Sequence, residues 1–145
     1  MRAMYESVEY AQRNPSWHEQ DAPWKAAHVE AMIKRNNLVF DTICEVGCGT
    51  GEILIALSAS FPKSTLVGYE ISPHAFERAE KKRTDRVTFH LRDLAHEEVF
   101  FDILLIADVI EHVEDYVAFI KSIKTKARYK IFHIPLDLSV QSVFR

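Results

Sequence analysis

From Thr42 onward the chain alternates short apolar runs with segments of helical periodicity, and this alternation constrains the fold more than any other feature. The apolar runs span residues 43–47, 65–70, 87–91, 101–108 and 130–136. The helical patterns between most of them span residues 52–61, 73–83 and 115–125. Strands that are apolar on both faces and alternate with helices are typical of a parallel sheet covered on each side. The pattern therefore predicts an α/β fold with five strands in a doubly wound, mainly parallel sheet.

The first 40 residues lack this alternation and contain no Gly. Residues 23–36, PWKAAHVEAMIKRN, predict a helix with Pro at its start. Its expected apolar face consists of Trp24, Ala27, Ala31 and Met32. We therefore expect two parts, an N-terminal helical segment over residues 1–40 and an α/β domain over residues 41–145.

Composition narrows the class of protein. A chain of 145 residues with 48% hydrophobic side chains has the size and apolar content of one compact domain. The formal net charge of −3 provides no broad positive field, so nucleic-acid binding is not expected. Cys44 and Cys48 make neither a disulfide framework nor a complete zinc site. With no signal-peptide pattern and no apolar run of about 18 residues, the sequence predicts a cytoplasmic protein without a membrane span.

A glycine-rich stretch, EVGCGTGE at residues 45–52, follows the first predicted strand and opens a helix. Its three glycines, at alternate positions, let the backbone turn sharply and leave no Cβ between the chain and a ligand. The free N–H groups of a helix N-terminus suit a carboxylate or a phosphate. The alternative is an ordinary strand-to-helix turn that binds no ligand.

The spacing within this stretch bears on the ligand. A dinucleotide-binding loop requires G-x-G-x-x-G/A, but the third position here is Glu52, and Gly51 falls one residue early. Glu45 places a second acid beside the loop. Acids fit a ligand with ammonium and sulfonium charges better than one with phosphates. This disfavours a nicotinamide-dependent oxidoreductase, which stays as an alternative.

Two further acids end predicted strands. Glu70 lies 19 residues after Gly51, where a carboxylate is placed to accept hydrogen bonds from ribose hydroxyls. Asp93 ends the third strand, where it could accept from an exocyclic amine while Leu94 packs on a purine ring. The alternatives are a solvated strand-end carboxylate for Glu70 and a turn or cap for Asp93.

Together, EVGCGTGE, the Glu and Asp that end the second and third strands, and ADVIEH after the fourth resemble class I S-adenosylmethionine-dependent methyltransferases. The resemblance covers about residues 42–137. It implies S-adenosylmethionine as the cofactor and assigns residues to each part of it. The ribose would contact Glu70, with Ile71 beside it, and the adenine would contact Asp93 and Leu94. The methionyl part would contact Glu45, Gly47, Cys48, Gly49, Thr50, Gly51 and Asp108.

The family usually has seven strands, with the last two forming a hairpin against the fifth. Here the sequence ends shortly after the fifth predicted strand, so we expect a C-terminally incomplete domain without the last two strands, taken from a longer protein. The alternative is that the fifth strand is left near a free edge. An open edge on the fifth strand predicts coverage by the N-terminal segment or self-association into a homo-oligomer. In this family such N-terminal segments often form a lid, which would place Trp17 or Trp24 over the cofactor. The alternative is that these rings pack the helix onto the sheet.

Two histidines are candidates for the catalytic base that a protonated oxygen or nitrogen acceptor requires. His112 follows the fourth strand, and His133 lies near the end of the fifth, at the sheet edge where ligands bind. A satisfied core histidine is the alternative for His133. Asp108, Glu111 and His112 also have a spacing that could suit a metal, but acidic capping explains it as well, and no metal is predicted.

The hypothesis is therefore an S-adenosylmethionine-dependent methyltransferase that acts on an oxygen or nitrogen of a small-molecule acceptor. The alternative is a domain that binds S-adenosylmethionine without catalysis and serves as a regulatory or scaffold partner.

Overall fold

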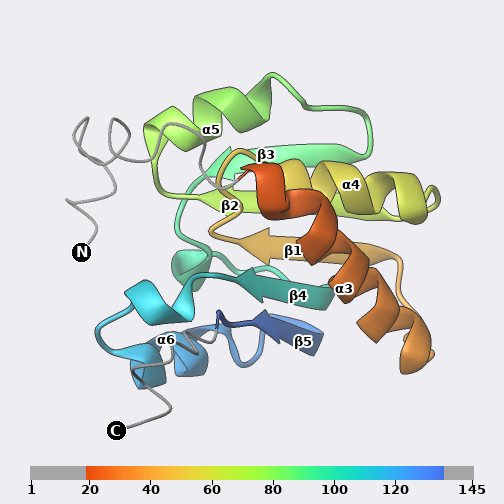
Figure 1. Cartoon of the computed structure of the whole chain (residues 1–145). Coiled ribbons are helices and arrows are strands. Elements are labelled where there is room, and N and C mark those ends of the chain that lie inside the picture. Colours follow the sequence, from red (N-terminus) through yellow and green to blue (C-terminus); the bar gives the residue numbers. More distant parts are fainter. Residues whose placement is uncertain (1–18, 136–145) are drawn as a thin grey trace, which may run out of the picture.

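The computed structural model describes residues 19–135, which form a parallel sheet with helices on both faces (Figure 1). The strands are β1 (Thr42–Val46), β2 (Thr65–Glu70), β3 (Val87–Leu91), β4 (Phe101–Ala107) and β5 (Ala127–His133). Their order is β3-β2-β1-β4-β5, and every pair is parallel. This confirms the predicted doubly wound sheet. The strand order reverses between β1 and β4, the point at which open α/β sheets bind ligands.

Two core clusters show how the sheet is covered. The helices are α3 (Ala22–Arg35), α4 (Glu52–Ser60), α5 (Pro73–Glu80) and α6 (Tyr116–Ile123), with 3-10 turns at Glu19–Asp21, Leu94–His96 and Ile110–His112. One cluster joins α3, α4 and α5 to one face of the sheet. The other joins α6 and the Leu94–His96 turn to the opposite face. Both faces are therefore buried, as the apolar strands require.

Local signals explain where the helices begin. Pro73 occupies the first turn of α5, where its missing N–H is no loss. Asp115 caps α6, because its Oδ1 accepts a hydrogen bond of 2.8 Å from the backbone N of Ala118.

At the opposite end of the sheet, Asp102 Oδ2 accepts hydrogen bonds from the backbone N of Asp41 and of Thr42, at 2.9 Å each. This carboxylate ties the start of β4 to the start of β1.

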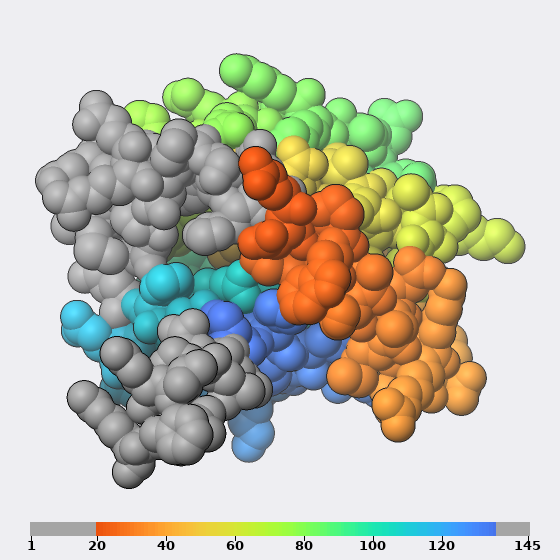
Figure 2. All heavy atoms as spheres, in the orientation of Figure 1, coloured from red at the N-terminus to blue at the C-terminus, as the bar shows by residue number. Residues whose placement is uncertain are grey.

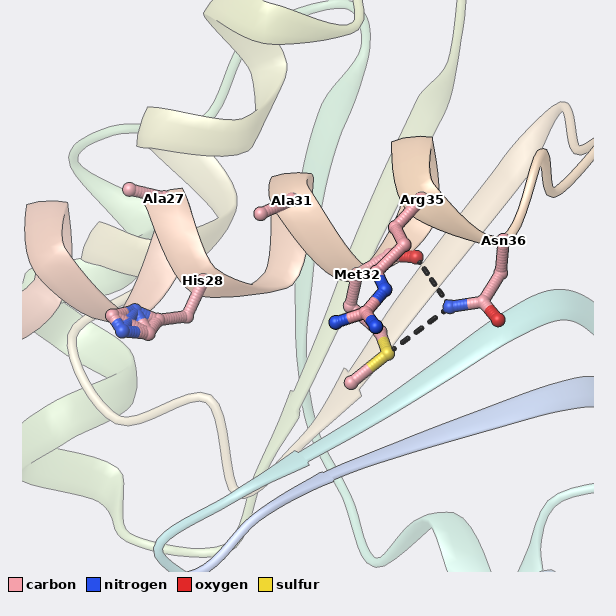
Figure 3. Close-up of a pocket in the computed structure, with 6 residues that line it drawn as sticks. All are labelled: Ala27, His28, Ala31, Met32, Arg35 and Asn36. Atoms are coloured by element: carbon pink, nitrogen blue, oxygen red, sulfur yellow. Dashed lines mark hydrogen bonds between the residues drawn. The ribbon is translucent and has the colours of Figure 1, made fainter.

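The predicted apolar face of the N-terminal helix is wrong. Trp24 and Met32 are 57% and 49% exposed, and Ala27 and Ala31 are exposed as well. The helix instead buries the stripe Ala22, Lys25, Ala26, Val29 and Ile33. Two apolar stripes compete on this helix, and the one with small alanines beside Val29 and Ile33 allows the close approach to α4. The exposed stripe borders a surface hollow with His28, Arg35 and Asn36 (Figure 3).

The predicted bounds of β2 and β3 agree with the structure, whereas β5 starts three residues earlier than predicted and ends at His133. Its first residue pairs with Phe101, and alternating basic residues had hidden this part of the strand. Within residues 19–135, β5 is the last strand of the sheet on its side. Coverage of this edge or self-association stays a prediction, and Trp17 lies outside the described residues. No helix in residues 19–135 is long and apolar enough to span a membrane.

Candidate functional site

Three carboxylates meet at the carboxyl edge of the central strands. Glu45 lies near the end of β1, Glu70 ends β2, and Asp108 directly follows β4. Parallel strands bring their carboxyl ends to one edge, so residues that are distant in sequence become neighbours there. The charges of Glu70 and Asp108 both act on Glu45. We call Glu45, Glu70 and Asp108 the acidic cluster.

The glycine-rich loop beside this cluster uses its glycines for two purposes. Gly47, Gly49 and Gly51 all have left-handed backbones, with φ of +67°, +54° and +80°. A Cβ on Gly47 would lie 2.8 Å from Val109, and one on Gly51 would lie 2.5 Å from Phe89, so these two make room for the protein's own packing. Among the described residues, a Cβ on Gly49 would meet nothing within 4 Å. Gly49 thus borders open space into which a ligand can approach the backbone.

The other loop residues turn inward. Cys48 is buried, and a Cβ on Gly68 of β2 would lie 2.6 Å from its Sγ, so the thiol packs over the strand. Burial raises the pKa of the Cys48 thiol. Thr50 is also buried, and its carbonyl accepts a 2.8 Å hydrogen bond from Lys82 Nζ. The Cys48 side chain is therefore committed to packing. Its backbone is bonded within the protein as well, because its N–H donates to the Tyr69 carbonyl at 3.1 Å and its carbonyl accepts from the Gly51 N–H at 2.9 Å.

Glu52 has a partner that the sequence did not indicate. Lys82 Nζ lies 2.7 Å from Glu52 Oε1, so the acid at the first position of α4 is neutralised. Repulsion of a pyrophosphate by Glu52 is correspondingly weaker than the sequence suggested. The charge argument against a dinucleotide rests instead on the buried Glu45.

Glu70 is bonded to the glycine loop. Its Oε2 accepts from the backbone N of Gly49, and its Oε1 from the backbone N of Ile71 and of Ser72, each at 2.8 Å. Burial raises the pKa of Glu70, while these backbone N–H groups pull it in the opposite direction. A carboxylate offers about four acceptor positions, so one on Oε2 is left for a ligand hydroxyl.

Glu45 is the least satisfied member of the acidic cluster. It is 2% exposed, and within residues 19–135 its Oε2 has no hydrogen-bond partner. Burial raises the pKa of Glu45 well above the ordinary value, the charge of Glu70 raises it further, and the positive charge of Lys25 lowers it. A buried polar group without a partner costs about 1–3 kcal/mol. Such a group is expected where a bound ligand supplies the missing donor.

Asp108 is satisfied by side chains. Its backbone is left-handed, with φ of +54°. Its Oδ2 accepts a hydrogen bond from Lys25 Nζ, and its Oδ1 lies 2.8 Å from His133 Nδ1. Burial raises the pKa of Asp108, but the hydrogen bonds and charges of Lys25 and His133 outweigh it and lower the pKa overall. Sequence reasoning missed Lys25, although its position on the stripe with Ala22, Ala26 and Val29 was a usable signal.

The two candidate bases lie in different surroundings. His133 contacts Asp108, and its ring meets Trp24 edge-on, with ring centroids 5.6 Å apart. Figure 2 shows the helix α3, in red and orange, beside the blue strand β5 that carries this histidine. His112 is exposed in the Ile110–His112 turn. No three His, Cys, Asp or Glu side chains in residues 19–135 are grouped to hold a metal ion.

The third strand contributes a cap and a core residue. Asp93 Oδ1 accepts a 2.9 Å hydrogen bond from the backbone N of Ala95, which is the capping geometry of the following turn. Its Oδ2 lies 3.8 Å from His96 Nε2. Leu94 is fully buried in the core cluster beneath the sheet, so its side chain is committed to packing. Ile71 is half-buried beside Glu70.

The chain is similar to known methyltransferases. A family model described as a methyltransferase domain matches residues 44–128. The malonyl-[acyl-carrier protein] O-methyltransferase of Anoxybacillus flavithermus (strain DSM 21510 / WK1) is 32% identical over 84 residues. That match covers 56% of this chain and 32% of the relative, so the chain spans about a third of the relative's length.

Solved structures share the fold. The plantazolicin methyltransferase BpumL in complex with S-adenosylhomocysteine matches with a TM-score of 0.71 at 16% identity. The match covers 87% of this chain and 52% of the BpumL chain. The magnesium protoporphyrin IX methyltransferase of Synechocystis PCC 6803 with bound S-adenosylmethionine matches with a TM-score of 0.66 at 21% identity. This match covers 87% of the present chain and 69% of the Synechocystis chain. The family model spans more than half of this sequence, from β1 into β5. The chain therefore belongs to the methyltransferase domain family. This is the family of class I S-adenosylmethionine-dependent methyltransferases, whose motifs the chain carries.

Proposed function

We propose that this chain binds S-adenosylmethionine at the carboxyl edge of β1, β2 and β3 and transfers its methyl group to an oxygen or nitrogen of a small-molecule acceptor. The observation that carries the proposal is the buried Oε2 of Glu45, which has no hydrogen-bond partner among residues 19–135. It lies in β1, two residues before a loop whose Gly49 borders open space. A cationic ligand would give this carboxylate the partner that the described residues do not provide.

The cofactor would be held by residues along this edge. Glu45 would accept from the methionyl ammonium, with the backbone of residues 47–51 around it and Asp108 on the β4 side. Glu70 would accept from a ribose hydroxyl through the free position on Oε2, beside the half-buried Ile71. Asp93 Oδ2 would accept from the adenine amine near Leu94, since the cap occupies Oδ1. The bound cofactor supplies an activated methyl group, and positioning is the main task of the protein.

His133 is the better candidate for the base. Its Nδ1 is fixed by Asp108 Oδ1 at 2.8 Å, which orients the ring and leaves Nε2 to take a proton from the acceptor's O–H or N–H. An acceptor that is already ionised needs no base, so positioning alone would suffice. His112 is the second candidate, on the exposed turn after β4. The curated relative is named as an O-methyltransferase, which favours an oxygen acceptor.

The proposal includes the wider assignments made from the sequence. Residues 1–40 would act as a helical cap on an α/β domain of residues 41–145, since Lys25 of α3 reaches Asp108 after β4. The net charge of −3 favours a small-molecule acceptor over a nucleic acid. Self-association through the edge of β5 and a cytoplasmic location are parts of the same proposal.

Titration calorimetry with S-adenosylhomocysteine, and with NADH as the comparison ligand, tests the binding step. We expect micromolar affinity for the first ligand and none for the second, whereas the reverse would support the oxidoreductase alternative. Methyl transfer from labelled S-adenosylmethionine to a malonyl thioester is the first activity assay. Binding without transfer to any acceptor tried, in both the wild type and His133→Ala, would favour the non-catalytic alternative.

A further inference from the structure

Lys25 occupies an unusual place for a lysine. It lies on the buried stripe of α3 with Ala22, Ala26 and Val29, and it is only 8% exposed. Lysine is almost never buried without a partner, because removing its charge from water is expensive. The amino end of α3 lies toward the arrowhead side of the sheet, which carries the lysine to the acidic cluster (Figure 1).

The lysine brings one positive charge to two of the three carboxylates of the acidic cluster. Its Nζ donates to Asp108 Oδ2, and its charge also acts on the buried Glu45. Glu70 satisfies itself through backbone N–H groups instead. Lys25 therefore contacts the acid that follows β4, and its charge also acts on an acid of β1; the strand order reverses between these two strands.

This position matters because the methyl donor and its product differ in charge at the reacting atom. S-adenosylmethionine carries a positive sulfonium, whereas S-adenosylhomocysteine carries a neutral thioether and is otherwise the same apart from the methyl group. With Glu70 on the β2 side suited to the ribose and Asp108 on the β4 side of the methionyl part, the sulfur that joins these two parts would lie within reach of the ion pair's charges. A fixed positive charge there opposes the donor, and a fixed negative charge favours it.

We propose that the ion pair of Lys25 with Asp108 sets the preference of the site between the cationic methyl donor and its neutral product. This inference rests on the proposed function, and it makes Lys25 a specificity-determining residue contributed by the N-terminal helix. The alternative is that the pair only anchors α3 to the sheet. An anchor would alter the affinity for both ligands in the same proportion, whereas a charge-setting pair alters their ratio.

The test is the ratio of the two dissociation constants, measured by calorimetry on the whole chain at low salt. In Lys25→Met, which keeps an apolar stem and leaves Asp108 unbalanced, we expect the ratio to shift toward S-adenosylmethionine by about tenfold. In Asp108→Asn, which leaves Lys25 unbalanced, the shift should have the opposite sign. Asn tolerates the left-handed backbone at this position, so this variant should fold. The double variant should return toward the wild-type ratio.

Lys34→Met is the matched control, because this lysine lies on the same helix and pairs with Glu30 at the surface. Its ratio should equal that of the wild type. Ratios that stay within about twofold of the wild type in both Lys25→Met and Asp108→Asn overturn the inference. If Lys25→Met fails to fold, the sign of the shift in Asp108→Asn decides alone. If the wild type binds neither ligand, the proposed function itself is wrong, which is a distinct result.

Discussion

The two halves of the carboxyl edge satisfy their carboxylates in different ways. On the β1–β2 side, Glu70 is held by backbone N–H groups close to it, and Glu45 keeps an oxygen without a partner among residues 19–135. On the β4–β5 side, Asp108 is held by Lys25 from α3 and by His133 from β5. One half leaves charge uncompensated, and the other balances it within the protein.

This difference separates two tasks. A buried carboxylate without a partner destabilises the free protein and favours any ligand that brings a donor or a positive charge. An internal ion pair has no such need, and it also holds a histidine and a helix in place. The β1–β2 half is thus suited to capture a ligand, and the β4–β5 half to position groups around it. The following experiments test that division, beginning with the largest effect.

Gly49→Val should abolish capture. The valine side chain would enter the open space beside the loop, and its left-handed backbone would add strain of about 1–2 kcal/mol. We expect S-adenosylhomocysteine affinity to fall by at least about a hundredfold in calorimetry, equivalent to about 3 kcal/mol. Gly51→Ala is the comparison, because its Cβ would lie 2.5 Å from Phe89 and should lower the melting temperature instead. Wild-type affinity in Gly49→Val would contradict this picture.

Glu70→Ala should weaken capture less severely. The change removes an acceptor for the ligand and also frees the backbone N of Gly49, Ile71 and Ser72, so the loop loses its tie to β2. We expect a loss of about 1–3 kcal/mol in binding free energy. Glu77→Ala, on the exposed side of α5, is a control that should bind as the wild type does. Unchanged affinity in both Gly49→Val and Glu70→Ala would show that the site is misplaced.

Asp108→Asn, in the β4–β5 half of the carboxyl edge, should reduce the stability of the protein. The folded pKa of Asp108 is lowered, so its contribution is present above the unfolded value of about 3.9 and is lost as the pH falls through the lower folded value. We expect the variant to unfold with about 1–2 kcal/mol less free energy at pH 7, since the pair is partly exposed. Urea unfolding from pH 7 downward measures this. A difference that does not shrink toward acid pH would rule out the charge as its cause.

Glu45→Gln should change the free energy of unfolding least among these variants, and it should raise it where Asp108→Asn lowers it. The folded pKa of Glu45 is raised, so wild-type stability falls as the pH rises from the unfolded value of about 4.3 through the folded value. The variant lacks this loss, so its free energy of unfolding relative to the wild type should rise between pH 5 and pH 8. Glu52→Gln, whose carboxylate pairs with Lys82, serves as the control in the same urea titrations. Parallel stability curves for the wild type and Glu45→Gln would refute the account of an uncompensated charge.

Sequence reasoning succeeded where the determinants are local. The bounds of β2 and β3 and the glycine loop could be predicted because each is defined within a few residues of chain. The contact of Lys25 with Asp108 joins residues 83 apart, so the local stripe on α3 can indicate that Lys25 is buried but not which residue it contacts. The buried face of α3 was missed for a related reason. Two stripes of similar hydrophobicity competed, and only packing against α4 selected between them.

The strand order β3-β2-β1-β4-β5 also has a consequence for synthesis. β2, the first neighbour of β1, follows it closely in the sequence, but its second neighbour, β4, starts about 60 residues after β1, where Asp102 bonds to Thr42. Until then β1 presents an open apolar edge, and long-range parallel pairing of this kind is slow and prone to aggregation. A nascent chain halted before residue 101 would therefore expose the strand that carries Glu45 to chaperones and to other copies of itself.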